Sequence, residues 1–171
     1  RFSPAVWTIG KEFGTIGCKV DAGDASWIIE VTTYRSDVYA GHSRKPAVAF
    51  GDTLDGDLRR RDFTINAMAV SIPDKKFVDP YGGLSDLARQ VLRTPATPES
   101  SFSDDPLRMM RAARFVAQLG FRPGPEVVAA MRGMTERISI ISAERIRDEL
   151  SKLLLTDRPR PGIDLLVSTG L

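Results

Sequence analysis

The hydrophobic pattern of the chain changes character at the stretch Arg93–Ser101, and this change limits the folds that the chain can adopt. Before it, short β-branched and aromatic runs alternate with Gly- and Pro-containing turns, which is typical of strands. After it, apolar residues recur at helical spacing. The stretch itself is rich in Pro, Ser and Thr. The sequence therefore predicts an α+β chain with two domains, 1–94 around a mixed or antiparallel sheet and 95–171 with helices only.

Two pairs of strands are predicted in the first domain. Glu12–Val20 and Ser26–Arg35 are β-branched and aromatic, and the turn DAGD between them indicates a hairpin. The polar stretch Arg35–Gly56 contains Gly and Pro and is typical of a loop. Asn66–Ile72 and Lys76–Pro80 are expected to form a second pair of short strands.

Helices are predicted for most of the chain after Tyr81. The segment Tyr81–Leu92 indicates a Gly turn followed by a short helix. Asp104–Phe121 has helical spacing of apolar residues, and Gly120 is a stop signal. Three more helices are expected, over the ranges Gly124–Met134, Ser142–Leu155 and Arg160–Leu171.

Composition and charge exclude several classes of function. The net charge is only +2, so any nucleic-acid contact must come from local clusters of charge. The single cysteine, Cys18, permits no internal disulfide and fits a reducing compartment. The single histidine, His42, is expected in a surface loop and rules out chemistry by a histidine pair. No apolar run reaches the roughly 18 residues of a membrane span, so we expect a cytoplasmic protein without membrane contact.

Three consecutive arginines, Arg59–Arg61, stand beside acidic residues and directly before an apolar run. Arginine carries a permanent charge and planar donors that suit phosphate oxygens. The cluster therefore indicates positive charge collected at a cleft, with the apolar run as sheet core. The alternative is a solvated helix face on which Asp55, Asp57 and Asp62 are the salt partners.

Asp105 and Arg108 suggest recognition of a base. An aspartate before Pro106 is a natural N-cap, and this role alone is enough to explain it. However, residues three apart share one edge of a helix, and a carboxylate only accepts hydrogen bonds whereas a guanidinium only donates them. Such a pair complements cytosine and adenine, which present an amine beside a ring acceptor. Arg111 and Arg114 continue the same face.

Two sets of carboxylates are candidate metal ligands. Two-metal phosphoryl transfer needs converging acidic side chains, and alternate residues of a strand share a face. The D-x-D at Asp55–Asp57 is instead expected in a loop, as an acidic cap at a helix start. Glu30 lies mid-strand on the same face as Thr32, so it is either exposed on a polar face or a metal ligand.

Four motifs in order carry a resemblance to a known family. They are RRRDFTINAMAV, DPYGGLSDLARQVLR, DDPLRMMRAARFVAQLGF and ISAERIRDELSKLLL. Together they resemble the class II tRNA nucleotidyltransferase (CCA-adding enzyme) and bacterial poly(A) polymerase family, from about Trp7 to the end of the chain. The resemblance implies a polymerase-β-like nucleotidyltransferase head followed by an all-helical neck.

The resemblance also implies an activity. It is Mg²⁺-dependent transfer of CMP and AMP from CTP and ATP to the 3′ hydroxyl of tRNA, with release of pyrophosphate. Poly(A) addition to RNA 3′ ends shares these motifs and stays open, as does a binding module that holds RNA or nucleotide without chemistry. The oligomeric state is not predicted.

Residue by residue, Asp105 and Arg108 match the family's base-reading pair. Arg61 and Asp62 fall in the motif that lines the nucleotide site near triphosphate and ribose. The nucleotide-binding residues that the resemblance implies in this chain are Arg60, Arg61, Asp62, Asn66, Asp105, Arg108, Arg111 and Arg114.

Supporting and metal-binding roles are implied for three further residues. Glu144 and Arg145 match a neck motif that supports the nucleotide site, and Glu30 sits where a third carboxylate would join the metal pair. Asp104 replaces the family's usual Glu and keeps its charge. The family's main metal ligands lie upstream of the motifs seen here, so we expect an internal piece of a longer enzyme that is inactive by itself.

Overall fold

The computed structural model describes residues 5–8, 14–38, 47–50 and 53–171. The chain divides into two compact units, residues 1–57 and 58–171. The observed content of helices and antiparallel sheets confirms the predicted α+β class. The predicted domain boundary at 94/95 stays a prediction, and each unit is described by itself below.

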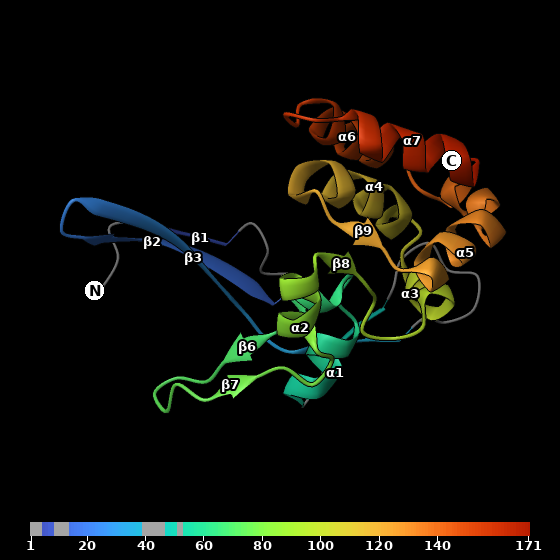
Figure 1. The fold of residues 1–171 in the computed structure, drawn as a ribbon. Helices are drawn as coiled ribbons and strands as arrows, with labels where there is room; N and C mark the ends of the chain where they lie inside the picture. Colours follow the sequence, from blue (N-terminus) through green and yellow to red (C-terminus); the bar gives the residue numbers. More distant parts are fainter. Residues whose placement is uncertain (1–4, 9–13, 39–46, 51–52) are drawn as a thin grey trace. The chain divides into compact units, whose positions relative to one another are not determined.

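The first unit contains a three-stranded antiparallel sheet in the order β1-β2-β3. Its strands are β1 (Ala5–Trp7), β2 (Thr15–Ala22) and β3 (Ala25–Thr32) (Figure 1). The β2–β3 pair is the predicted hairpin, with Gly17 opposite Glu30. Gly23 in the turn has φ +61°, a left-handed conformation that glycine adopts without steric cost.

The predicted loop Arg35–Gly56 is wrong in part. It contains a second antiparallel pair, β4 (Arg35–Val38) and β5 (Ala47–Phe50), with Arg35 opposite Phe50. Each strand has only four residues, which is too short for a period-two pattern to outweigh the surrounding Gly and Pro. His42 lies outside the described residues.

The D-x-D segment also differs from the predicted loop. Helix α1 (Leu54–Arg59) includes Asp55 and Asp57 in its first turn. The helix-start interpretation of these acids is therefore confirmed, because negative side chains are favourable at a helix N-terminus.

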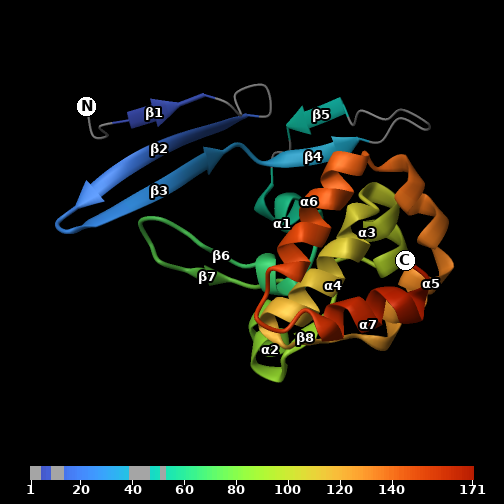
Figure 2. The ribbon, with the colours of Figure 1, turned by 90° about the horizontal axis from the view of Figure 1, so that it is seen from above.

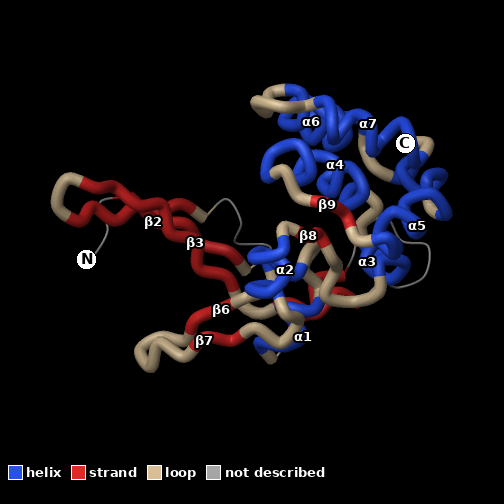
Figure 3. The backbone as a smooth tube through the Cα atoms, in the orientation of Figure 1, coloured by secondary structure: helices blue, strands red, loops and turns tan. Residues whose placement is uncertain are grey.

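The apolar run after the arginines is not the expected sheet core. Phe63 and Ala67 are fully buried, but a 3₁₀ turn, η2 (Thr64–Asn66), lies between them. The strand that follows is only β6 (Ala69–Val70), paired with β7 (Phe77–Val78) in a hairpin (Figure 3). Ile72 is 92% exposed. Phe63, at the start of the run, packs instead in the core formed with the helices.

Helices make up most of the second unit. After α2 (Gly83–Arg89), the strand β8 (Val91–Leu92) pairs in parallel with β9 (Arg122–Pro123). The other elements are α3 (Pro98–Asp104), α4 (Leu107–Leu119), α5 (Pro125–Gly133), η3 (Thr135–Ile140), α6 (Ala143–Leu154) and α7 (Arg160–Thr169).

Helix α4 is the centre of this helical unit. It lies alongside α6 and α7 (Figure 2), and its Met109, Ala112 and Ala113 are fully buried. It ends at Gly120, as predicted, with φ +69° and a backbone N–H that donates to the Val116 carbonyl. No helix among the described residues is long and apolar enough to cross a membrane.

Candidate functional site

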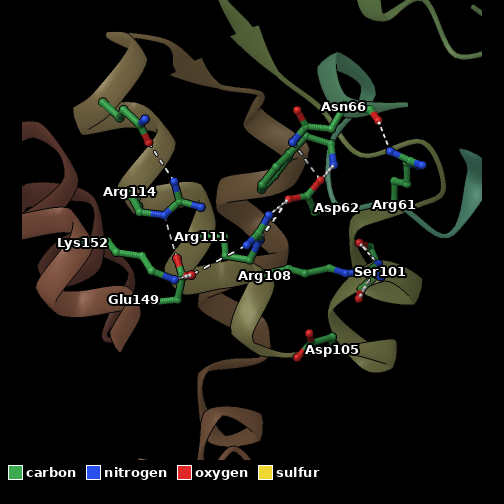
Figure 4. A network of polar contacts seen from close by, with 12 residues as sticks. Arg61, Asp62, Asn66, Ser101, Asp105, Arg108, Arg111, Arg114, Glu149 and Lys152 are labelled. Atoms are coloured by element: carbon green, nitrogen blue, oxygen red, sulfur yellow. Dashed lines mark hydrogen bonds and ion pairs between the residues drawn. The ribbon is translucent and has the colours of Figure 1, made fainter. Parts of the chain in front are cut away.

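Asp62 connects the arginine-rich segment to α4 (Figure 4). Its Oδ1 accepts hydrogen bonds from the Phe63 backbone N–H at 2.8 Å and from the Asn66 Nδ2 at 3.0 Å. Its Oδ2 accepts from the Arg111 Nε at 2.9 Å. The structure thus brings together three of the predicted nucleotide-binding residues, Asp62, Asn66 and Arg111.

Burial and charge act in opposite directions on Asp62. Burial raises the pKa of its carboxyl group. The Arg111 charge and the hydrogen bonds from Asn66, Arg111 and Phe63 lower the pKa by more than burial raises it. The net pKa lies below the ordinary value, so Asp62 is ionised at neutral pH. A permanent negative charge therefore neutralises Arg111 and orients its guanidinium.

A second carboxylate, Glu149 on α6, pairs with Arg111 and with two further basic residues, Arg114 and Lys152. Its Oε2 accepts from the Arg114 Nε at 2.7 Å, and its Oε1 lies 3.1 Å from the Lys152 Nζ and 3.7 Å from an Arg111 Nη. The Arg114 guanidinium carbon also lies 4.3 Å from the centre of the Phe115 ring. Arg111 and Arg114 are thus fixed from α6.

Glu149 is a residue that the sequence analysis missed. It is 3% exposed, and burial raises its pKa, but hydrogen bonds from Arg114 and Lys152 and the charges of Arg114 and Arg111 bring the net pKa below the ordinary value. Its position in the sequence could have revealed that it is buried, because Glu149 lies three residues after Ile146 and four before Leu153, on the buried face of α6. An acid at a core position needs a cation.

The two depressed pKa values predict how stability depends on pH. A group with a lower pKa when folded stabilises the protein fully above its unfolded pKa, and this contribution is lost as pH falls through the folded value. The free energy of unfolding should therefore fall as pH drops below about 4, the ordinary carboxyl value. Urea unfolding between pH 7 and pH 2.5 measures this loss. The double variant Asp62→Asn/Glu149→Gln should show a flatter dependence, and an identical slope would contradict the assignment.

The predicted capping role of Asp105 is confirmed. Its Oδ1 accepts from the Leu107 backbone N–H at 3.2 Å, and Pro106 already has helical dihedral angles. Its Oδ2 accepts from Arg145 Nη2 on α6 at 2.9 Å, and the Asp105 side chain is 27% exposed. Arg145, predicted as a supporting residue, therefore contacts the predicted base reader directly.

Arg108 has different partners from Asp105. Arg108 is only 9% exposed. One guanidinium nitrogen donates to the Ser101 carbonyl at 3.3 Å and to the Ser101 Oγ at 2.8 Å. The other terminal nitrogen donates to the Arg60 carbonyl. Figure 4 shows the Arg108 side chain directed to Ser101, with no dashed line between Arg108 and Asp105. Reading of a base by the pair stays a prediction.

The remaining predicted residues lie in different settings. The exposed Arg61 donates from Nη1 to the Asn66 carbonyl at 3.2 Å. Glu144 is exposed in the first turn of α6. Glu30 is exposed on β3 in the first unit. Among the residues that the structure describes, no three His, Cys, Asp or Glu side chains gather to hold a metal ion.

Comparison with known proteins identifies the family. A family model described as the poly A polymerase head domain matches residues 2–93, and one described as a probable RNA and SrmB-binding site of polymerase A matches residues 120–171. The chain is 43% identical to the CCA-adding enzyme of Levilactobacillus brevis and 41% identical to that of Bacillus subtilis. Each match covers 95% of the chain but 40% of the relative.

Solved structures give the same result. The crystal structure of the Bacillus stearothermophilus CCA-adding enzyme in complex with CTP matches 99% of the chain with a TM-score of 0.85 at 36% identity, and 40% of that protein is covered. A tRNA nucleotidyltransferase complexed with a primer tRNA and an incoming ATP analog matches 97% of the chain, and 45% of that protein, with a TM-score of 0.76 at 29% identity. The chain therefore belongs to the class II tRNA nucleotidyltransferase and bacterial poly(A) polymerase family, as its motifs predicted.

Proposed function

We propose that the chain is part of a template-independent RNA nucleotidyltransferase that adds CMP and AMP, from CTP and ATP, to the 3′ end of tRNA. The observation that carries this proposal is the similarity to CCA-adding enzymes over 95% of the chain, although the chain spans only about 40% of their length. In this reaction the tRNA 3′ hydroxyl attacks the α-phosphorus of the nucleotide, and pyrophosphate leaves. Such an enzyme is expected to act in the cytoplasm.

The second unit supplies residues for the nucleotide. Arg60 and Arg61, with Asp62 and Asn66, would contact the triphosphate and ribose, because guanidinium groups suit phosphate oxygens and the amide and carboxylate suit hydroxyls. The other proposed residues, grouped on or against α4, are Asp105, Arg108, Arg111 and Arg114, with Glu144 and Arg145 as supports. Residues 1–94 would then act as the head and 95–171 as the neck.

Divalent metal, which we take to be Mg²⁺, would assist transfer in the whole enzyme. Glu30 is our candidate from this chain for one of its ligands. It is exposed on β3, and one carboxylate does not make a two-metal centre. The described residues therefore do not fit a complete metal site by themselves.

The test is incorporation of radiolabelled nucleotide into a tRNA that lacks its terminal CCA. The full-length protein should add C, C and A and then stop, whereas the 171-residue chain alone should give no product. Turnover by the chain alone would show that the catalytic carboxylates lie within it.

Poly(A) addition is the second candidate, favoured by the matching descriptions of the two family models. It predicts long A tails from ATP alone and no use of CTP. A third result, binding of RNA that weakens steeply with salt and ignores the nucleotide, would favour a non-catalytic module.

A further inference from the structure

A buried carboxylate, Asp86, forms an ion pair with the 42% exposed Arg93 side chain. Asp86 on α2 is 1% exposed, and its two carboxylate oxygens lie 3.0 and 2.9 Å from the Arg93 Nε. Its Oδ2 also accepts a hydrogen bond of 2.7 Å from the Thr64 hydroxyl. The hydrogen bond to Asp86 raises the pKa of Arg93 above its ordinary value. None of the residues proposed to bind nucleotide belongs to this group.

Thr64 is held from three directions. Its backbone N–H donates to the Arg93 carbonyl at 2.8 Å, and its hydroxyl donates to Asp86. Its carbonyl oxygen lies so close to Gly83 that a Cβ at that position would come within 2.2 Å of it. The residue is 1% exposed. The turn that carries Thr64 therefore has little freedom to shift.

Thr64 lies between two residues of the proposed nucleotide site, and one of them, Asn66, belongs to the same turn. Asp62 lies two positions before Thr64, and Asn66 lies two positions after it. The hydrogen bond between Asp62 and Asn66 spans the turn on one side, while the contacts of Thr64 anchor it from the other. A displacement of the turn would move both side chains together.

We propose that Asp86 is a positioning residue for nucleotide binding, which acts through the Thr64 hydroxyl to fix Asp62 and Asn66. The inference rests on the proposed function. A carboxylate suits this task because it accepts from Thr64 and Arg93 at once and cannot donate in return. A misplacement of about 1 Å in a binding group can cost up to roughly a hundredfold in rate.

The experiment uses Thr64→Val in the full-length protein, because this change keeps the shape and removes the hydroxyl. Thr64→Ser keeps the hydroxyl and serves as the rescue. Thr169→Val is the matched control, since the buried Thr169 hydroxyl donates to the Leu165 and Leu166 carbonyls of its own helix, α7. Each variant is measured for kcat and KM with CTP and ATP, for nucleotide binding, and for the midpoint of urea unfolding.

Thr64→Val is expected to raise KM and weaken nucleotide binding about tenfold or more, while Thr64→Ser and Thr169→Val stay within about twofold of wild type. The double variant Thr64→Val/Asp86→Ala should bind nucleotide about as weakly as Asp86→Ala alone, because both changes remove the same Thr64–Asp86 hydrogen bond. A Thr64→Val protein that is destabilised like Thr169→Val but binds nucleotide normally would overturn the inference and leave the proposed function intact. A wild-type protein that neither binds nor incorporates CTP or ATP would overturn both.

Discussion

Glu149→Gln is expected to lower the free energy of unfolding by about 3 kcal/mol, the lower end of the range for breaking one partner of a buried ion pair. Glu149 is 3% exposed and is the shared partner of Arg114, Arg111 and Lys152. Glutamine keeps the shape but removes the charge. The lower end applies because the Arg111 and Lys152 side chains are 31% and 60% exposed, so water partly solvates them.

Urea unfolding of the 171-residue chain at pH 7 measures this loss. Asp148→Asn on the same helix is the control, because the Asp148–Arg147 pair has side chains 58% and 71% exposed. Exposed pairs contribute less than about 1 kcal/mol. Equal effects of the two changes would show that Glu149 does not hold α6 to α4.

Under the proposed function, Asp105→Asn in the full-length protein is expected to remove the proposed preference for CTP and ATP over GTP and UTP. A side chain that pairs with a base edge at two atoms discriminates by about 1–3 kcal/mol, or roughly 5- to 150-fold. Each oxygen of the carboxylate can accept a second hydrogen bond, so the bonds from Leu107 and Arg145 leave room for a base amine. Asparagine replaces one acceptor with a donor.

Asp105→Asn also separates base reading from helix capping. The remaining amide oxygen can still accept from the Leu107 N–H, so stability should change little, whereas Asp105→Ala should lose about 1 kcal/mol as well. Nucleotide competition assays on both variants give the order of preference. If Asp105→Asn keeps the wild-type order, Asp105 is a cap and nothing more.

Ser101 and Arg60 anchor the Arg108 side chain, and its role in base reading stays a prediction. Of the five N–H donors of a guanidinium, the structure uses three, toward Ser101 and the Arg60 carbonyl. The anchoring to Ser101 and Arg60 was not foreseeable, because Arg60 lies 48 residues before Arg108.

Local signals predicted local features well. Gly120 ends α4, Asp105 caps it, and Asp55 and Asp57 occupy the first turn of α1. These features depend on side chains within four residues of one another, where backbone sterics and capping hydrogen bonds dominate. The family motifs also lie in continuous stretches, so the order of the residues alone was enough to identify them.

Contacts between distant segments were the part that local patterns missed. Phe63 was expected in a sheet and instead packs in the helical core, and Glu149 was overlooked although it anchors Arg114 from 35 residues away. Thr64 and Asp86, 22 residues apart, are a third case. Residue order and spacing thus determined the α+β class, the ends of helices such as α4, and the family. The partners of the buried charges emerged only when packing brought separate helices together, because a buried charge takes whichever opposite charge the fold places beside it.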